Sequence, residues 1–213
     1  MPLYQTISVS GSTRIYIWKV EESEDLLAED TILTENSKLR VAGMRSEIHR
    51  RGYLSIRHLL AEAGYTDNDL FYDEVGKPHL KDDSFISITH SGIFTGIIVS
   101  KEKEVGIDIE KQREKIIPIA HKFTPRKEYN SITNTETLIR KLTVVWGAKE
   151  SLYKIYATKG LSFLNHIYIH DFALDALETS GKIKFFADHS SYDIEFLEFD
   201  GYTCVYALKR NNE

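Results

Sequence analysis

Asp108 and Glu110 lie in the run GIDIE, where apolar and other residues alternate as they do along a β-strand. Alternate side chains of a strand share a face, which directs Ile107 and Ile109 to the core. Asp108, Glu110 and Gly106 then share the opposite face, where the glycine would leave room for a ligand. The two carboxylates would stand about 6.5–7 Å apart at their Cα atoms, and Mg²⁺ prefers such oxygen ligands. The alternative is a solvated strand face that carries two acids.

A row of side chains further along the chain could complete that site. Trp146, Glu150 and Lys154 recur four residues apart, on one side of a predicted helix and at the edge of its apolar stripe. Glu150 could therefore join the strand carboxylates as a third metal ligand. Lys149 falls inside the stripe, where its ammonium must either reach solvent or meet an anion. The alternative for Glu150 and Lys154 is a surface ion pair that contributes about 0.3–0.5 kcal/mol.

A third group of residues has the donors that a phosphate monoester accepts. Residues 76–78 (GKP) and 87–91 (SITHS) combine a lysine, hydroxyl groups and an imidazole at predicted turn or strand-end positions. Taken singly, His90 is more often a structural histidine than a ligand-binding one. The group therefore predicts a phosphate site only in combination with the acidic motifs.

Composition limits the classes of protein that these residues could serve. The chain has 213 residues, with 27 Lys and Arg against 32 Asp and Glu and a net charge of −5. That balance excludes a generally basic nucleic-acid-binding surface, although a local cationic pocket stays open. One cysteine, Cys204, cannot form an internal disulfide or a structural zinc cluster. Its setting in the alternating run YTCVYAL favours a core residue over a nucleophile.

The apolar segments predict a protein of the cytoplasm. The first residues, MPLYQTISVSGSTR, show no basic stretch followed by an apolar one, so we expect no secretory signal. No apolar run approaches the ~20 residues that a membrane-spanning helix needs. We therefore expect neither a membrane nor a nucleic acid as a partner.

The elements that must carry these residues form two halves of similar size. A helical stretch breaks near Gly43 and stops at Gly64, and a strong apolar stripe predicts a helix over 136–157. Shorter helical pieces are predicted over 116–121 and 125–132. Alternation predicts strands over 14–20, 84–90, 93–100, 104–110, 166–172, 182–187, 192–199 and 202–209. This order predicts an α+β protein of two paired subdomains, residues 1–102 and 103–213.

The spacing of the two acidic motifs resembles a known family. Residues 106–110 (GIDIE), followed by 146–154 (WGAKESLYK), are similar to the paired signature of 4′-phosphopantetheinyl transferases. Residues 76–78 and 87–91 match upstream motifs of the larger, monomeric class, the type that activates surfactin synthetase. The resemblance spans about residues 35–170.

The resemblance implies a fold, a reaction and a set of partners. Two similar α+β subdomains would be related by a pseudo-two-fold, with coenzyme A in the cleft between them. The N-terminal subdomain would supply the 3′-phosphate and nucleotide side of that site, and the C-terminal one the metal and catalytic motifs. With Mg²⁺, or Mn²⁺ as an alternative, the enzyme would transfer 4′-phosphopantetheine to a serine of an apo carrier protein and release adenosine 3′,5′-bisphosphate. Acidic carriers of fatty-acid, polyketide or peptide synthesis would dock on a basic and apolar patch.

The resemblance also assigns roles to single residues. It implies metal ligands at Asp108, Glu110 and Glu150, and Lys154 matches the lysine that steadies the pyrophosphate. Asp108, Glu150 and Lys154 are thus the expected catalytic residues. The acceptor of the serine proton stays open between Glu150 and a metal-bound water.

Several residues are candidates for binding the coenzyme. His90 matches the histidine at the 3′-phosphate, and Thr89 stands as a hydroxyl where the family usually has other residues. The further candidates are Ser91, Lys77, Pro78 and the stripe lysine Lys149. Among the N-terminal cations Lys38, Arg40, Arg45 and Arg51, we expect Lys38 and Arg51 to contact the 3′-phosphate. The alternative for each is a solvated helix face.

Two other functions compete with carrier-protein modification. The acidic cluster could serve a Mg²⁺-dependent phosphohydrolase or nucleotidyl enzyme that acts on another substrate. The chain could also be a non-catalytic coenzyme A or carrier-protein binding module. Asp108, Glu110, Glu150 and Lys154 together argue against the module, because binding alone would not require all four.

Overall fold

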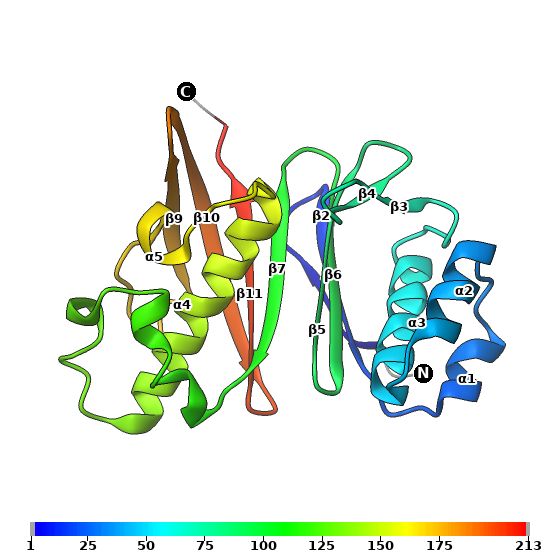
Figure 1. Cartoon of the computed structure of the whole chain (residues 1–213), viewed down its shortest axis with the longest axis horizontal. Coiled ribbons are helices and arrows are strands. Elements are labelled where there is room, and N and C mark those ends of the chain that lie inside the picture. The colour runs from blue at the N-terminus through cyan, green and yellow to red at the C-terminus, as the bar shows by residue number, and fades with distance from the viewer. Residues whose placement is uncertain (1–2, 212–213) are drawn as a thin grey trace. The chain divides into compact units, whose positions relative to one another are not determined.

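The computed structural model describes residues 3–211, and the chain divides into two compact units, residues 1–102 and 103–213. Each unit has its own antiparallel sheet and its own helices (Figure 1). Helices that stand apart from antiparallel strands confirm the α+β class predicted from the element order. Within residues 3–211, every helix is too short or too polar to cross a bilayer.

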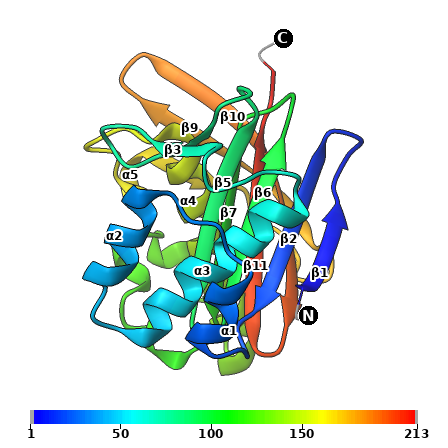
Figure 2. The ribbon, with the colours of Figure 1, turned by 90° about the vertical axis from the view of Figure 1, so that its right-hand side faces the viewer.

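Unit 1 is built on a four-stranded sheet in the order β1-β2-β6-β5. The strands are β1 (Leu3–Ser8), β2 (Thr13–Lys19), β5 (Phe85–Ser91) and β6 (Phe94–Ser100). Helix α3 (Glu47–Glu62) packs on β2 and β6, as Figure 2 shows, and α1 (Glu24–Glu29) packs on α3. Helix α2 (Glu35–Gly43) precedes α3, and a small hairpin of β3 (Leu70–Tyr72) and β4 (Pro78–Leu80) follows it.

Two helix ends in unit 1 fall where the sequence predicts. The Thr34 hydroxyl caps α2 by accepting a hydrogen bond from the Ser37 backbone N–H, at 3.3 Å. The predicted break at Gly43 is confirmed, because α2 ends there and α3 begins at Glu47. Gly64 follows α3 at φ +86°, a left-handed conformation that glycine adopts without strain.

Unit 2 contains a five-stranded sheet in the order β7-β11-β10-β9-β8. Its strands are β7 (Val105–Lys111), β8 (Ile167–Ile169), β9 (Glu178–Phe185), β10 (Asp188–Phe199) and β11 (Tyr202–Lys209). The long helix α4 (Thr135–Tyr156) packs on β7 and β11, and the short helix α5 (Phe163–His166) precedes β8. The helix predicted over 136–157 is therefore confirmed to within a residue at each end.

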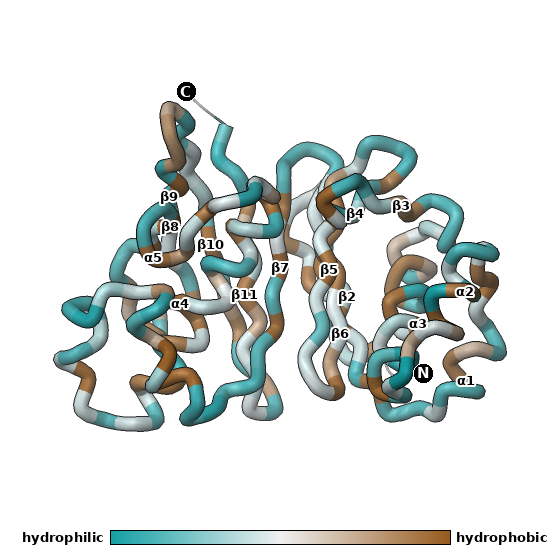
Figure 3. Tube along the Cα trace, viewed as in Figure 1, coloured by the Kyte–Doolittle hydropathy of each residue, from teal (hydrophilic) through white to brown (hydrophobic). Residues whose placement is uncertain are grey.

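Each unit buries an apolar core of its own, and Figure 3 shows hydrophobic segments along the strands and α3, with mostly hydrophilic connecting loops. In unit 1, α3 packs its buried leucines against the sheet, and in unit 2, α4 does the same with Ala148, Leu152 and Ile155. Cys204 is fully buried in β11, where burial raises the pKa of its thiol. The prediction of a core cysteine is confirmed.

Two predicted stretches take different forms. No α-helix forms over residues 116–121 or 125–132, where three-residue 3₁₀ helices stand instead. The first stretch overlaps η1 (Glu114–Ile116) and η2 (Ala120–Lys122), and the second contains η3 (Arg126–Glu128). Pro118, between η1 and η2, lacks the backbone N–H that an α-helix running through both would need. The strand predicted over 166–172 is reduced to β8, because the Ser162 side chain caps α5 and keeps residues up to His166 helical.

Candidate active site

The Asp108 and Glu110 side chains lie on the face of unit 2's sheet that α4 covers. In β7 they pair in register with Val205 and Thr203 of β11, and Val205 belongs to the core under α4. A Cβ atom on Gly106 would stand 2.1 Å from the Ser151 carbonyl oxygen of α4. The prediction that Gly106 leaves room for a ligand is therefore wrong. The missing side chain instead lets the helix backbone approach the strand.

Lys154 brings the end of α4 to this strand. Its Nζ donates to Asp108 Oδ1 at 2.8 Å and to the Ile107 carbonyl at 2.7 Å. Asp108 is only 6% exposed, so this ion pair is largely shielded from water. Two residues that stand 46 positions apart, and that the sequence singled out separately, are thus in direct contact.

Glu110 and Glu150 complete a group of three carboxylates around the pair. Burial is the main reason that the pKa of Glu150 rises to about 7; Asp108 and Glu110 add repulsion, and Lys154 opposes the rise. Burial and Asp108 likewise raise the pKa of Glu110, while a hydrogen bond from the Trp146 side chain lowers it. The three predicted metal ligands are therefore near enough to repel one another.

The donor set fits a hard divalent cation by its chemistry. Three carboxylates supply only oxygen ligands, as Mg²⁺ prefers, and a cation would relieve the repulsion that raises the pKa of Glu150. In the described range 3–211, no group of three or more His, Cys, Asp or Glu side chains is closed tightly enough to form a ready metal cluster. Lys154, which binds one Asp108 oxygen, supplies a positive charge to the group, and Arg113 also acts on Glu110.

Lys149 lies deeper than its neighbours in the same motif. Its Nζ donates to the carbonyls of Phe163, at 2.7 Å, and Ile167, at 2.6 Å. Burial lowers the pKa of this ammonium to about 8, and Glu128 partly opposes the shift. The expectation that this ammonium reaches solvent or meets an anion is wrong, because two backbone carbonyls hold it instead. A coenzyme contact for Lys149 stays a prediction.

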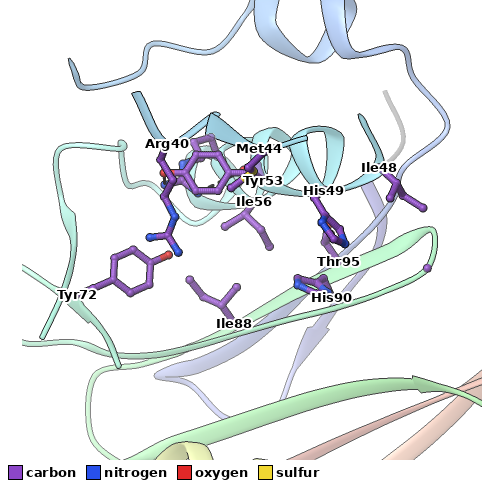
Figure 4. Close-up of a pocket in the computed structure, with 13 residues that line it drawn as sticks. Arg40, Met44, Ile48, His49, Tyr53, Ile56, Tyr72, Ile88, His90 and Thr95 are labelled. Carbon is purple, nitrogen blue, oxygen red and sulfur yellow. Dashed lines mark hydrogen bonds between the residues drawn. The ribbon is translucent and has the colours of Figure 1, made fainter. Parts of the chain in front are cut away.

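Unit 1 carries a separate pocket of about 530 Å³ beside His90 (Figure 4). It lies between α2, α3, the β3–β4 hairpin and strand β5. Four of its lining side chains are cationic or can become so: Arg40, His49, Arg57 and His90. Apolar and small residues supply much of the rest of the lining, and no carboxylate lines it: Met44, Ile48, Gly52, Tyr53, Ile56, Tyr72, Ile88, Gly92 and Thr95. The pocket therefore suits an anion attached to a flat or apolar group.

Arg40 is the side chain of this pocket best suited to bind an anion. Its guanidinium lies over the rings of Tyr72, at 5.2 Å, and Tyr53, at 5.7 Å, and Figure 4 shows it directed toward the cavity. Arg57, by contrast, is neutralised by a buried ion pair with Asp67 at 2.9 Å. The His49 and His90 rings stack at 6.4 Å between centroids. One full positive charge and two imidazoles thus face the same space.

Other predicted coenzyme residues do not line the pocket. Thr89 is buried on the opposite side of β5, while Lys77 and Pro78 belong to the β3–β4 hairpin. Lys38 pairs with Glu35 at 2.7 Å, and Arg51 donates to the Val20 carbonyl at 3.2 Å. Of the four N-terminal cations considered, Arg40 is the one that lines the pocket.

Sequence reasoning missed His49, Tyr53 and Tyr72. A usable signal existed, because His49, Gly52, Tyr53 and Ile56 recur at the spacing of one helix face. That face combines polar, small and aromatic residues, which is typical of a ligand-binding wall rather than of a core. No comparable signal marks Tyr72, whose place depends on how the hairpin folds back.

The comparisons agree with the motif assignment. Residues 104–207 match the family model of the 4′-phosphopantetheinyl transferase superfamily. The matched segment is nearly the whole of unit 2 and contains Asp108, Glu110, Glu150 and Lys154. No curated protein matches the chain. The match covers just under half of the chain and shows a similarity of unit 2 to that superfamily.

Proposed function

We propose that this protein transfers the 4′-phosphopantetheine arm of coenzyme A to a serine of an apo carrier protein. The observation that carries the proposal is the contact between Asp108 and Lys154, which lies inside the matched superfamily segment with Glu110 and Glu150 beside it. The GKP and SITHS motifs of unit 1 support the larger, single-chain type. We expect it to act as a monomer in the cytoplasm, on carriers of fatty-acid, polyketide or peptide synthesis.

The reaction is a phosphoryl transfer to an alcohol. The serine oxygen forms a bond to the β-phosphorus, the bond to the leaving oxygen breaks, and adenosine 3′,5′-bisphosphate departs. The serine proton must leave during the step, and Glu150 is the carboxylate proposed to accept it. Such transfers depend mainly on positioning and on charge neutralisation, which charged residues held at a shielded site provide.

Asp108, Glu110 and Glu150 are the residues that would hold a Mg²⁺ or Mn²⁺ ion. When bound, such an ion neutralises pyrophosphate charge and helps to orient the phosphates. Lys154 contributes a second positive charge at the same place, and its two bonds to Asp108 and the Ile107 carbonyl fix its direction. The lysine is thus proposed to bind the pyrophosphate, as the resemblance implies.

The pocket of unit 1 is proposed to bind the nucleotide end of coenzyme A. His90 keeps its predicted role at the 3′-phosphate, and its neighbours Arg40 and His49 join it. Arg40 replaces Lys38 and Arg51 in this role, because those two cations are engaged with Glu35 and the Val20 carbonyl. The tyrosine rings beside Arg40 offer apolar faces to the rest of the nucleotide.

Mass spectrometry of the carrier tests the proposal directly. Incubation with coenzyme A, Mg²⁺ and an apo carrier should add one phosphopantetheine group per carrier, and chelation of the metal should stop the reaction. Glu150→Gln should abolish transfer and leave the fold intact. Glu136→Gln, an exposed change in the first turn of the same helix, is the matched control and should retain the wild-type rate.

Two outcomes would contradict the proposal. A panel of fatty-acid, polyketide and peptide carriers that all stay unmodified would overturn it. Release of adenosine bisphosphate without any carrier would instead favour a Mg²⁺-dependent phosphohydrolase. Coenzyme A binding without either reaction would favour a binding module.

A further inference from the structure

Lys149 is a buried ammonium with two backbone acceptors. It lies on α4, one residue before Glu150, and is 2% exposed. The carbonyls of Phe163 and Ile167 accept its hydrogen bonds at 2.7 and 2.6 Å. These acceptors stand at the start of α5 and the start of β8. Lys149 therefore ties a segment that follows α4 in the chain back onto the helix.

Helix α5 is the part of the tied segment with the least support of its own, because β8 pairs with β9 and buries Ile167 in the core. Helix α5 has only four residues, too few to be stable alone, and it follows Gly160, which has φ +89°. The Ser162 hydroxyl caps it with a single bond to the Asn165 N–H. A hydrogen bond from a charged donor contributes about 1.5–3 kcal/mol, so the two carbonyl bonds of Lys149 are the strongest polar contacts that hold this segment.

The segment carries an aromatic ring that supports Trp146. The Phe163 ring lies 5.4 Å from the Trp146 ring and 5.6 Å from the Tyr153 ring, centroid to centroid. Phe123 supports the indole from another side at 5.1 Å. Because the Phe163 carbonyl is one of the two acceptors of Lys149, the tether and the ring belong to the same residue.

Trp146 in turn reaches the acidic group. It lowers the pKa of the Glu110 carboxyl, so its side chain acts on that carboxylate. The two carbonyl bonds of Lys149 and the ring contact of Phe163 thus link Lys149 to Trp146, and the effect on the pKa links Trp146 to Glu110. Each of these contacts lies within unit 2.

We propose that Lys149 is a positioning residue of the acidic site, which holds Phe163 against Trp146 and thereby fixes the indole that orients Glu110. The consequence for the reaction rests on the proposed transfer, while the tether itself does not. This role differs from the coenzyme contact that the sequence predicts for Lys149. A coenzyme phosphate would have to reach an ammonium that is 2% exposed and already bound to two carbonyls.

Lys149→Met tests the tether, because methionine has a similar length and no donor. The change is made in a Trp18→Phe background, because Trp18 is the other tryptophan of the chain and its emission would overlap that of Trp146. We expect faster amide hydrogen exchange over residues 161–169 and a shift of the Trp146 emission. With a carrier substrate, kcat should fall roughly 10- to 100-fold, as changes beside metal ligands typically do, while KM for coenzyme A stays within about twofold.

Lys141→Met is the matched control. Lys141 also lies on α4 and also binds the segment that follows, through Asp171 Oδ1 at 2.8 Å and the Phe172 carbonyl. The change releases residues 171 and 172 and leaves the bonds of Lys149 and the contact between Phe163 and Trp146 in place, so emission and kcat should stay at wild-type values. Phe163→Leu is the second variant: it keeps both carbonyl bonds and removes the aromatic support, so emission and kcat should change while exchange over 161–169 stays slow.

These measurements distinguish a failure of the positioning role of Lys149 from a failure of the proposed function. A rise in KM for coenzyme A of more than about tenfold in Lys149→Met, with kcat and Trp146 emission unchanged, would show a coenzyme contact and overturn the positioning role. Unchanged emission in Phe163→Leu would overturn it as well. If the wild-type protein modifies no carrier, the proposed function fails, and exchange and emission still decide whether Lys149 holds Phe163 against Trp146.

Discussion

Arg40 is the residue on which the assignment of the nucleotide pocket most depends. It brings a full positive charge to a cavity that no carboxylate lines, and two tyrosine rings flank its guanidinium. The tyrosine faces attract the guanidinium without neutralising it, so its charge stays available to a ligand. Lys38, by contrast, is exposed and pairs with Glu35 at 2.7 Å, so its charge is partly offset.

Arg40→Met should weaken coenzyme A binding, because it removes the charged donor proposed for the 3′-phosphate. We expect Kd to rise roughly 10- to 100-fold, in line with the about 1.5–3 kcal/mol that a charged hydrogen bond contributes. Lys38→Met is the control and should bind as the wild type does. Calorimetry with coenzyme A and with its 3′-dephospho form checks the assignment: an equal loss for both ligands would show that Arg40 binds another part of the molecule.

Gly106→Ala should destabilise unit 2, because the new Cβ would stand 2.1 Å from a backbone oxygen of α4. Overpacking of this kind costs about 1–3 kcal/mol and here displaces the helix that carries Glu150 and Lys154. Gly43→Ala, where a Cβ would meet nothing within 4 Å, should change the free energy of unfolding by less than about 1 kcal/mol. Urea denaturation measures both, and equal midpoints would refute the close approach of α4 to β7.

At the scale of elements, a buried polar network fixes α2 against α3. Asp67 accepts from the Thr34 N–H and hydroxyl, both at 2.8 Å, and from the Ser37 hydroxyl at 3.0 Å. Arg57 of α3 donates to the same carboxylate at 2.9 Å, with exposures of 4% and 2% for the two side chains. Because α2 carries Arg40 and α3 carries His49, the network also sets the width of the pocket.

Asp67→Asn should cost about 3–5 kcal/mol, since it leaves Arg57 buried without its charge partner. Burial raises the pKa of Asp67, but hydrogen bonds from Thr34 and Ser37, with Arg57, outweigh it and bring the pKa below its ordinary 3.8. The unfolded chain therefore binds the proton first, and this stability is present above pH 3.8 and lost as pH falls through the folded pKa.

The free energy of unfolding, measured from neutral to acidic pH, checks the effect of Asp67. The gap between wild type and Asp67→Asn should be widest near neutrality and should shrink as pH falls below 3.8. The exposed substitution Asp30→Asn should leave the curve close to that of the wild type. A gap that does not vary with pH would contradict the role given to the Asp67 carboxylate.

Local sequence patterns predicted most of the helices and strands. The features that they did not predict depend on contacts between residues far apart in the sequence. The apolar stripe of α4 and the alternation in β7 and β11 depend on neighbours in sequence, so their bounds were predictable. Gly106 was misread because its constraint comes from Ser151, which packs on it from another element. Arg40 could not be preferred over Lys38, because the choice depends on where the β3–β4 hairpin places Tyr72.

At the scale of the whole molecule, the chemistry is divided between two units. The cationic pocket belongs to residues 1–102 and the acidic site to residues 103–213, and each unit has its own sheet and core. The family match covers only the second of these. Sequence spacing could identify the acidic motifs, whereas the pocket needs α2, α3, the β3–β4 hairpin and β5 in their folded arrangement.

The proposal that one chain acts alone leads to a prediction about mixtures of variants. Arg40→Met impairs unit 1 and Glu150→Gln impairs unit 2. If a single chain supplies both, an equimolar mixture should transfer no faster than the sum of its parts, at a coenzyme A concentration well below the KM of Arg40→Met. Recovery of transfer in the mixture would show that unit 1 of one copy works with unit 2 of another, as in a dimer. Sedimentation at the assay concentration then reports whether the recovered activity follows the dimer.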